Sequence, residues 1–506
     1  MYQDDGYLFF NIQPIEIQVD EDSVDVEMRI TEGEQANINK VIVNGNTLTS
    51  DHVILRELRT MPGQKFSRSN IIRTQQELAQ LGYFDPEKIS IKPEPNPAEG
   101  TVNIQYKLEE KSSNQFELSG GWGGFYGFIG TLGLTINNFS LRKIFKEWRP
   151  IPQGDGQKLA IRFQSNGPRF QNYSISFTEP WLGGKKPHSF SVSLSHSLQA
   201  GGAFLGSVVT APTSTTQSMQ VTSATISFGR RLTFPDDRFT MINSLSFNRY
   251  KMNNWGIIPG FSSGISNNFS LNTTISRNSI DNPTYPRSGS SITFAVNLTP
   301  PYSMFMDRNW SDLTSAQRYE FVEYHKWMFD NSWYLKLAGN LVLRASSHIG
   351  FLGTYTDKVG SSPFERFVLG GSGMTFNNVI LGVDNIALRG YPDQKITPVE
   401  YINGVKSTSG GVAYNKFVLE LRYPISLQPS ATVFVVTFAE AGNNWGAVSD
   451  MNPFDLKRSV GLGARIFMPA FGMLGFDYAW GFDNYPGKLQ KGVEGQFHFT
   501  IGQQIR

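Results

Sequence analysis

The sequence contains no cysteine, and its 45 basic residues nearly balance its 43 acidic residues. The absence of cysteine excludes disulfides and thiolate metal sites. A net charge of +2 gives no overall field that would attract nucleic acid, and the six histidines do not fall into a metal-ligand spacing. No apolar run reaches the roughly 18 residues that a membrane-spanning helix needs. We therefore expect no metal, no cofactor, no nucleic-acid partner and no helical membrane span.

The sequence is instead rich in glycine and aromatic residues, with 49 Gly, 38 Phe, 19 Tyr and 9 Trp beside only 17% charged residues. This composition favours many strands and turns. It is also typical of a transmembrane β-barrel, in which lipid-facing and lumen-facing residues alternate. The first ten residues, MYQDDGYLFF, lack the apolar core of a signal peptide. Since an outer-membrane protein needs one, the barrel interpretation predicts that the sequence is a fragment of a longer chain.

Residues 36–111 are rich in charge and predict one α+β module. The segment INKVIVNGNTLTS reads as a strand and a turn, and SDHVILREL reads as a short helix with Ser50 at its N-cap. A second helix in SRSNIIRTQQELAQLGYF is capped by Ser67 and stopped at Gly82, and its apolar side carries Ile71, Leu78 and Leu81. KISIKPEP and GTVNIQYKLEEK then alternate as two strands. The predicted order of elements is β-α-α-β-β.

Residues 1–35 repeat only the end of this module. Two segments, GYLFFNIQPIEIQV and DSVDVEMRITEGEQ, read as its last two strands without the helices that should precede them. We therefore predict that residues 1–35 are the C-terminal part of an earlier copy of the same module.

Beyond residue 112 the sequence alternates with the two-residue period of strands. In SWYLKLAGNLVLRA, one face carries Trp333, Leu335, Leu337, Leu341 and Leu343, and the other carries Tyr334, Lys336, Asn340 and Arg344. A soluble sandwich also alternates. However, Lys, Arg, His and Asn in mid-strand opposite a uniformly apolar face favour a barrel that is apolar outside and polar inside. The fold class predicted for residues 113–506 is a transmembrane antiparallel β-barrel of about 16 strands.

Several motifs, in a fixed order along the chain, resemble those of one known family. The module carries VNGNTLTSDHVILREL and ELAQLGYF, and the later part carries FTEPWLGGKKPHSFSVSL, DNPTYPRSGSS, ALRGYPD, FVLELRYPI, FAEAGNNW, RSVGLGARIFMPAFGMLGFDYAWGFD and FHFTIG. In these motifs the chain resembles the BamA-type outer-membrane protein assembly factors, whose superfamily joins periplasmic POTRA modules to a 16-stranded barrel. The resemblance covers essentially the whole chain, and the loops are similar to those of Bacteroidetes members. It implies a complete POTRA domain at 36–111, part of another at 1–35, and the barrel at 113–506.

The resemblance also implies an internal latch. In the family, an Arg-Gly-Phe/Tyr motif lies at the tip of the sixth extracellular loop, which folds back into the lumen. The matching motif lies within residues 387–394, and the residues implied to form the latch are Arg389, Gly390, Tyr391, Glu420 and Glu440. An arginine suits this role because its rigid fork of five donors can bind carboxylates. The alternative is a solvated loop arginine, which is the common environment of this residue type.

The two glutamates differ in how well their own strands support this assignment. Alternation in FVLELRYPI places Glu420 on the lumen side. Glu440 has the same parity as Phe434 and Phe438, which would place it among apolar residues. Its assignment as a partner of Arg389 therefore comes from the resemblance alone.

The second implied site is a lateral gate between the first and last barrel strands. The expected first strand, residues 114–124, is dense in glycine, which weakens strand pairing. Its gate residues are Phe116, Leu118, Gly120, Gly121, Gly123 and Gly124, and those of the expected last strand, 493–502, are Phe497, Phe499, Ile501 and Gly502. An opened first strand would expose backbone groups that can template an incoming strand. The alternative is that the glycines only relieve crowding or permit a bend.

No catalytic motif accompanies these sites. GGWGGFYGFIG lacks the Lys-Ser/Thr of a phosphate loop, and GGSGM is not a nucleophile elbow, so we expect no enzyme activity. The resemblance implies the central subunit of the β-barrel assembly machinery, with its barrel in the outer membrane and its POTRA modules in the periplasm. The implied partners are unfolded outer-membrane protein clients, accessory subunits including lipoproteins, and outer-membrane lipid. The alternatives are a POTRA-barrel translocator or translocation-assembly protein, a passive porin, and a soluble β-rich adhesin.

Overall fold

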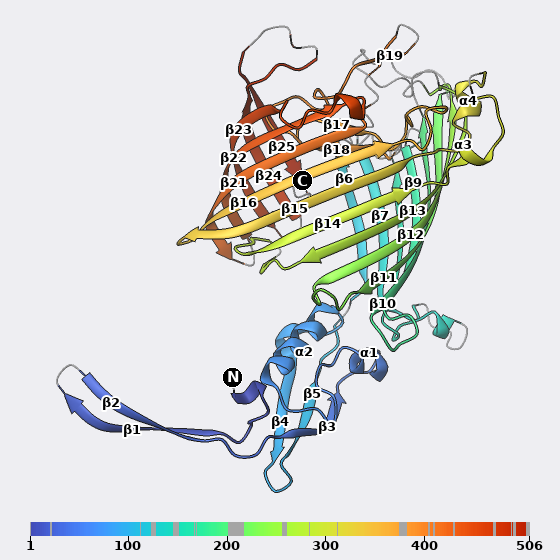
Figure 1. Ribbon diagram of the computed structural model, residues 1–506. Helices are drawn as coiled ribbons and strands as arrows, with labels where there is room; N and C mark the ends of the chain where they lie inside the picture. The colour runs from blue at the N-terminus through green and yellow to red at the C-terminus, as the bar shows by residue number, and fades with distance from the viewer. Residues whose placement is uncertain are drawn as a thin grey trace. The chain divides into compact units, whose positions relative to one another are not determined.

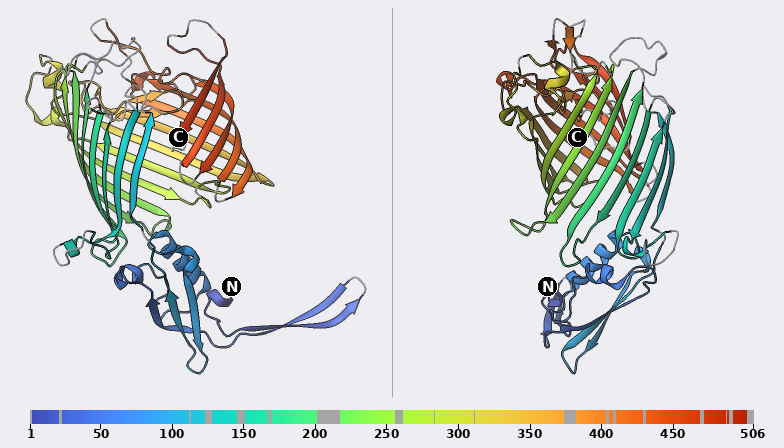
Figure 2. Two further views of the ribbon diagram at one scale, coloured as in Figure 1. Left: turned by 180° about the vertical axis from the view of Figure 1, so that it is seen from behind. Right: turned by 90° about the vertical axis from the view of Figure 1, so that its right-hand side faces the viewer.

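The structure is a computed structural model that describes residues 2–20, 23–111, 113–122, 128–144, 151–165, 167, 170–200, 217–255, 261–282, 284–310, 312–373, 382–402, 405–407, 410–428, 431–468, 472–486, 488 and 492–501. Figures 1 and 2 show its strands and helices. The chain divides into two compact units. The first is built from residues 1–117, 133–161 and 176–187, and the second from residues 118–132, 162–175 and 188–506.

Residues 36–111 contain the elements that the sequence predicts, in the predicted order. They are β3 (Asn37–Asn44), α1 (Asp51–Leu55), α2 (Arg68–Gln80), β4 (Ser90–Asn96) and β5 (Thr101–Lys107). The strand order is β3-β5-β4, with β3 parallel and β4 antiparallel to the central β5. Apolar residues of both helices and of β5 pack into one buried core, which includes Val53, Ile54, Leu78, Val102, Ile104 and Tyr106.

The helix boundaries agree with the sequence except at α1. The Ser67 side chain accepts a hydrogen bond from the Asn70 N–H at the start of α2, and Gly82 follows that helix with a φ of +76°. Ser50 is the N-cap of α1, but its side chain makes no capping bond. The helix ends at Leu55 rather than continuing through Leu58, because the next turns tighten to bonds between residues three apart.

The two strands expected within residues 1–35 pair only with each other. β1 (Asn11–Asp20) and β2 (Ser23–Thr31) form an antiparallel hairpin, in which Ile12 lies opposite Ile30 and Pro14 opposite Met28. Ile12, Met28 and Ile30 are exposed on this apolar face. A two-stranded hairpin alone is marginally stable in water. That residues 1–35 belong to an earlier POTRA domain stays a prediction.

The remaining long strands form one 16-stranded sheet, which confirms the predicted number of strands. In sheet order they are β6 (Gln115–Trp122), β7 (Phe128–Phe139), β8 (Gln157–Ser165), β9 (Phe170–Glu179), β10 (His188–Ala200), β11 (Ser218–Arg231), β12 (Phe239–Asn253), β13 (Gly264–Asn278), β14 (Gly289–Leu298), β15 (His325–Ala338), β16 (Leu341–Gly353), β21 (Ala413–Gln428), β22 (Ala431–Trp445), β23 (Lys457–Met468), β24 (Gly472–Gly481) and β25 (Glu494–Ile501). From β10 to β25, each neighbouring pair is antiparallel. Two short helices, α3 (Tyr302–Phe305) and α4 (Ser315–Arg318), precede β15, and no helix in the described residues has the length and hydropathy to cross a membrane.

The segment SWYLKLAGNLVLRA is a hairpin and not part of one strand. β15 ends at Ala338, Gly339 turns the chain with a φ of +55°, and β16 begins at Leu341. Glycine adopts this left-handed conformation without steric cost. Leu335 pairs with Leu343, so the apolar face continues across the turn. Asn340 lies in the turn and not on the polar face where alternation placed it.

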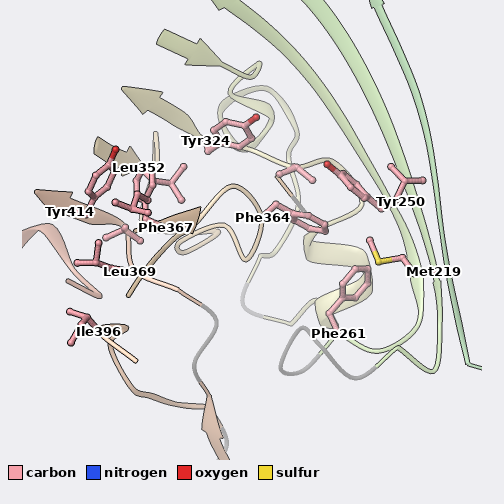
Figure 3. Packing of buried hydrophobic residues seen from close by; sticks show 14 of the residues in the cluster. Met219, Tyr250, Phe261, Tyr324, Leu352, Phe364, Phe367, Leu369, Ile396 and Tyr414 are labelled. Carbon is pink, nitrogen blue, oxygen red and sulfur yellow. The ribbon is translucent and has the colours of Figure 1, made fainter. Parts of the chain in front are cut away.

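Each strand of the sheet pairs with the next one along the chain, and β16 pairs directly with β21. Residues 354–412, which connect β16 to β21, form a long loop. This loop contains the parallel pair β17 (Phe367–Leu369) and β18 (Asp384–Ile386) and the antiparallel pair β19 (Glu400–Ile402) and β20 (Val405–Ser407). Its apolar side chains pack against buried residues of the sheet, as Figure 3 shows for Phe364, Phe367, Leu369, Ile396, Met219, Tyr250, Leu352 and Tyr414. The loop is therefore an integral part of the core.

Candidate functional site

Arg389 lies in this loop, shortly after β18, and its side chain is 1% exposed. Glu440 of β22 binds both its side chain and its backbone. The Nε and Nη2 atoms of Arg389 donate to Oε1 of Glu440 at 2.9 and 2.7 Å, and the backbone N–H of Arg389 donates to Oε2 at 2.7 Å. Charge-assisted bonds of this kind are stronger than neutral ones. Glu440 therefore fixes the direction of the arginine as well as its position.

Two further carboxylates from other strands complete the arginine fork. Nη2 of Arg389 donates to Oε2 of Glu420 in β21 at 3.3 Å, and Nη1 donates to Oδ1 of Asp477 in β24 at 3.2 Å. The Cζ atom of Arg389 lies 3.3 Å from the ring centroid of Phe438 in β22, where the ring face attracts a cation. The structure thus brings Arg389 together with both predicted glutamates.

The parity of Glu440 is explained by the position of its aromatic neighbours. Phe434, Phe438 and Glu440 are all buried and share one face of β22. The parity that Glu440 shares with these two phenylalanines is therefore compatible with its contact to Arg389. Phe438 stacks on Arg389, and Phe434 lies beside the guanidinium of Arg422 at 5.6 Å. Aromatic rings occupy the inner face here because they pack against buried cations.

Each carboxylate of this cluster also contacts a second cation. Glu420 binds Arg422 at 2.7 Å, Asp477 binds Arg465 at 3.0 Å, and Glu440 lies 3.5 Å from Lys416. All of these groups are buried. Isolated buried charges are costly, whereas paired and hydrogen-bonded ones are tolerated. We call these residues, together with Arg389, the ion cluster.

Gly390 and Tyr391 extend the contacts to the remaining strands at this end of the sheet. Gly390 has a φ of +90°, and a Cβ atom there would lie 2.8 Å from the Cβ of Ser459 in β23, so only glycine fits. Its N–H donates to Nε2 of His498 in β25 at 3.0 Å. The Tyr391 hydroxyl donates to the Arg458 carbonyl of β23 at 2.7 Å. The motif therefore contacts each of the last five strands, from β21 to β25.

Sequence reasoning missed Asp477, Phe438 and His498. A signal was present for two of them, because Asp477 lies between the outward Phe476 and Tyr478, and His498 lies between Phe497 and Phe499. A polar residue with that parity faces the lumen. In the described residues, no group of three His, Asp or Glu side chains is arranged to hold a metal ion.

The predicted gate strands are the two ends of the sheet. The strand order runs from β25 to β6, and Phe116 in β6 is 78% exposed. Phe497 and Phe499 in β25 are also exposed. Leu118, Gly120 and Gly121 lie within β6 and Ile501 ends β25, whereas Gly123, Gly124 and Gly502 lie outside the described residues.

Comparisons with known proteins agree with this architecture. The Omp85 superfamily domain matches residues 153–505, and the POTRA family, described as a surface antigen variable number repeat, matches residues 36–111. The chain is 23% identical over 484 residues to outer membrane protein assembly factor BamA of Neisseria meningitidis, covering 91% of this chain and 53% of that protein. It is 24% identical over 515 residues to BamA of Nitratidesulfovibrio vulgaris, covering 99% and 56%. The chain thus spans about half the length of these relatives.

Two solved structures share the fold. The crystal structure of BamA from Haemophilus ducreyi lacking POTRA domains 1–3 aligns with a TM-score of 0.62 at 20% identity, covering 98% of this chain and 90% of that chain. CdiB from Escherichia coli aligns with a TM-score of 0.55 at 12% identity, covering 99% and 82%. The chain belongs to the Omp85 superfamily and is a BamA-type protein, in which a periplasmic POTRA domain precedes a 16-stranded barrel of the outer membrane.

Proposed function

We propose that the chain is the barrel-forming part of the central subunit of the β-barrel assembly machinery, which folds and inserts outer-membrane proteins. The observation that carries the proposal is Arg389, buried among Glu420, Glu440 and Asp477. This contact ties an internal loop to the strands at one end of the sheet. A passive porin needs an open lumen, whereas the loop packs its apolar residues against the inner face of the sheet.

The proposed mechanism uses the difference between the two ends of the sheet. On one side, the Gly390 N–H holds His498 of β25, so the last strand is braced from within. On the other side, β6 contains Gly120 and Gly121, and glycine weakens pairing. Opening between them exposes the edge of β6, on which a client strand can pair through backbone hydrogen bonds. No energy source is needed, and thinning of the lipid beside the weak seam lowers the barrier to insertion.

The POTRA domain offers an edge for clients or accessory lipoproteins. β3 and β4 are its edge strands, but β4 contains Pro93 and Pro95, which have no N–H to donate. Within a strand, prolines direct the missing N–H away from the ladder, so the outer edge of β4 lacks two donors. We therefore assign strand addition to the edge of β3. A rigid spacer role is the alternative for this domain.

The proposal is tested by controlled depletion of the protein in its own host, with the amounts of all outer-membrane proteins measured. We expect a broad loss of β-barrel proteins, which wild-type protein restores and an Arg389→Ala variant does not. The matched control is Arg231→Ala, which removes an exposed arginine at the end of β11. Unchanged levels of β-barrel proteins after depletion would contradict the proposal.

The second candidate is a POTRA-barrel translocator or translocation-assembly protein. It is retained because the fold also aligns with CdiB. The same depletion separates the two functions, since a translocator predicts the loss of one secreted substrate while other outer-membrane proteins remain. Large and steady single-channel conductance in planar bilayers would favour the porin alternative instead.

A further inference from the structure

The outer face of the sheet carries a groove that the ion cluster does not use. It has a volume of about 860 Å³ and crosses β15, β16, β21, β22 and β23, which lie side by side in Figure 1. Alternation places this groove on the side of the sheet opposite the ion cluster. Ala439 and Ala441 line it, while Glu440 between them turns its carboxylate inward to Arg389. In a membrane barrel this outer face contacts lipid.

The shape of the groove follows from the register of these strands. Ala345 of β16 lies opposite Leu419 of β21, which lies opposite Ala439 of β22, which lies opposite Val460 of β23. The side chains that line the groove are therefore small on β16 and β22, where they are alanines. They are larger and exposed on β21 and β23, where they are Leu419 and Val460. Trp333 of β15, the strand next to β16, is also exposed and lines the opposite edge of the groove from β23. The groove is accordingly deepest along two separate strands, which suits two extended acyl chains.

A cation lies at one end of the groove. Arg458 is the second residue of β23, it lines the groove, and its side chain is 66% exposed. Asp483 pairs with the guanidinium at two points, Nε at 3.2 Å and Nη2 at 3.0 Å, and so sets its direction. A lipid phosphate would share the arginine with this carboxylate. Arg458 lies near the start of β23, beside the apolar groove. An exposed arginine in this position can contact a lipid phosphate.

We propose that this groove binds one diacyl lipid of the outer membrane, with its acyl chains along β16 and β22 and its phosphate at Arg458. The lipid covers the outer face of the strands whose inner face holds Glu420 and Glu440. The lipid would thus pack on the outer face of β21 and β22, while the loop contacts the inner face of the same strands. The proposal requires only the membrane barrel and is independent of the assembly function.

The test is native mass spectrometry of the purified full chain after incubation with phosphatidylglycerol or with diacylglycerol of the same acyl chains. We expect one retained phosphatidylglycerol. Ala439→Leu fills the groove and should lower its retention about tenfold. The matched control Ala464→Leu adds the same side chain to the outer face of β23, away from the groove, and should retain lipid as wild type does. Arg458→Gln should remove the preference for phosphatidylglycerol over diacylglycerol.

Equal retention by wild type and Ala439→Leu, or equal loss in both alanine variants, overturns the proposal. Equal retention of the two lipids by wild type overturns the role of Arg458. Each variant is first checked for the folded form by its heat-dependent mobility in gels. If Ala439→Leu does not fold, Ala345→Leu on β16 fills the other deep part of the groove and takes its place. Because no client is inserted in this assay, its failure is distinct from failure of the proposed function.

Discussion

Arg389 shows why this position requires arginine rather than any cation. Its guanidinium reaches Glu440, Glu420 and Asp477 through its separate nitrogen atoms while its face lies on Phe438. A lysine has one compact ammonium group and could not serve three carboxylates and a ring at once. The desolvation of a buried charge is costly, so the complete set of partners is what makes the burial tolerable.

We predict that Arg389→Ala lowers the stability of the folded barrel by about 3 kcal/mol, near the low end of the cost of a broken buried ion pair. The cost lies at that end because Glu440, Glu420 and Asp477 each keep a second cation. Urea unfolding followed by heat-dependent mobility measures the change. Arg231→Ala should leave the urea concentration at the unfolding midpoint unchanged. An equal decrease of this midpoint in both variants would argue against the latch.

Glu110 is a second residue whose surroundings have a measurable consequence. Its carboxylate accepts hydrogen bonds from the N–H groups of Thr47, Leu48 and Thr49 and from the Thr47 hydroxyl. Burial by itself would raise its pKa, but these bonds outweigh burial and lower the pKa of Glu110 from 4.5 to about 2. The carboxylate therefore ties the end of the POTRA domain to the turn that follows β3.

We predict that Glu110→Gln destabilises the POTRA domain at pH 7 by about 1–2 kcal/mol, a figure reduced for solvent screening at this half-exposed site. The lowered pKa means that wild type has this stabilisation above pH 4.5 and loses it as the pH falls towards 2. The difference between wild type and variant should therefore shrink across that interval. Denaturation of the full chain at several pH values, followed by protease cleavage of the POTRA domain, measures it. A constant difference would contradict the assignment.

At the scale of elements, a second group of buried charges attaches the loop between β16 and β21 to the sheet. Besides Arg389, the buried Lys326 of β15 binds Glu365 at 3.0 Å and Asp384 at 2.6 Å. Its ammonium also lies 5.1 Å from the ring of Phe367. Lys326 lies on β15, whereas the residues that bind Arg389 in the ion cluster lie on β21 to β24. The loop is thus bound to two separate parts of the 16-stranded sheet.

We predict that Lys326→Met releases the part of the loop near β17 while the tip at Arg389 stays bound. The physical reason is that Glu365 and Asp384 lose the cation that neutralises both of them. Limited proteolysis should cut the loop at least about fivefold faster, corresponding to roughly 1 kcal/mol of local opening. Lys336→Met, on the exposed end of the same strand, is the control. Cleavage at the wild-type rate would show that the contact does not hold the loop.

At the scale of the whole molecule, the proposed function depends on β6 and β25 separating. The chain has no cysteine, so engineered pairs form defined disulfides. We predict that cysteine pairs placed between β6 and β25 abolish complementation when oxidised and that a reductant restores it. Growth of the depletion strain, with and without reductant, is the measurement.

The matched control for these pairs is Ser332→Cys with Ser346→Cys, two residues that already lie opposite each other in β15 and β16. A disulfide there joins strands that are not expected to part, so complementation should continue. Growth supported by an oxidised β6–β25 pair would refute the lateral gate.

The sequence by itself determined the fold class and the composition of the latch motif. A period of two, abundant glycine and aromatic residues, and the absence of apolar runs favoured a barrel over a soluble sandwich, because the face of a strand residue depends on its local position. The resemblance then singled out Arg389, Glu420 and Glu440, which the structure brings within hydrogen-bond distance. The face of Glu420 also followed from local alternation, whereas Glu440 was assigned from the resemblance alone.

Only the tertiary structure decided which strands meet the loop. Asp477, Phe438 and His498 lie on three strands well separated in the chain from Arg389. Their meeting depends on how the loop folds back and on which faces turn inward. Phe438 illustrates this, since an aromatic residue in a barrel faces lipid by local pattern but here lies under a buried cation. These groups meet because the loop folds back onto strands that are distant in the sequence, and local strand propensity does not determine that contact.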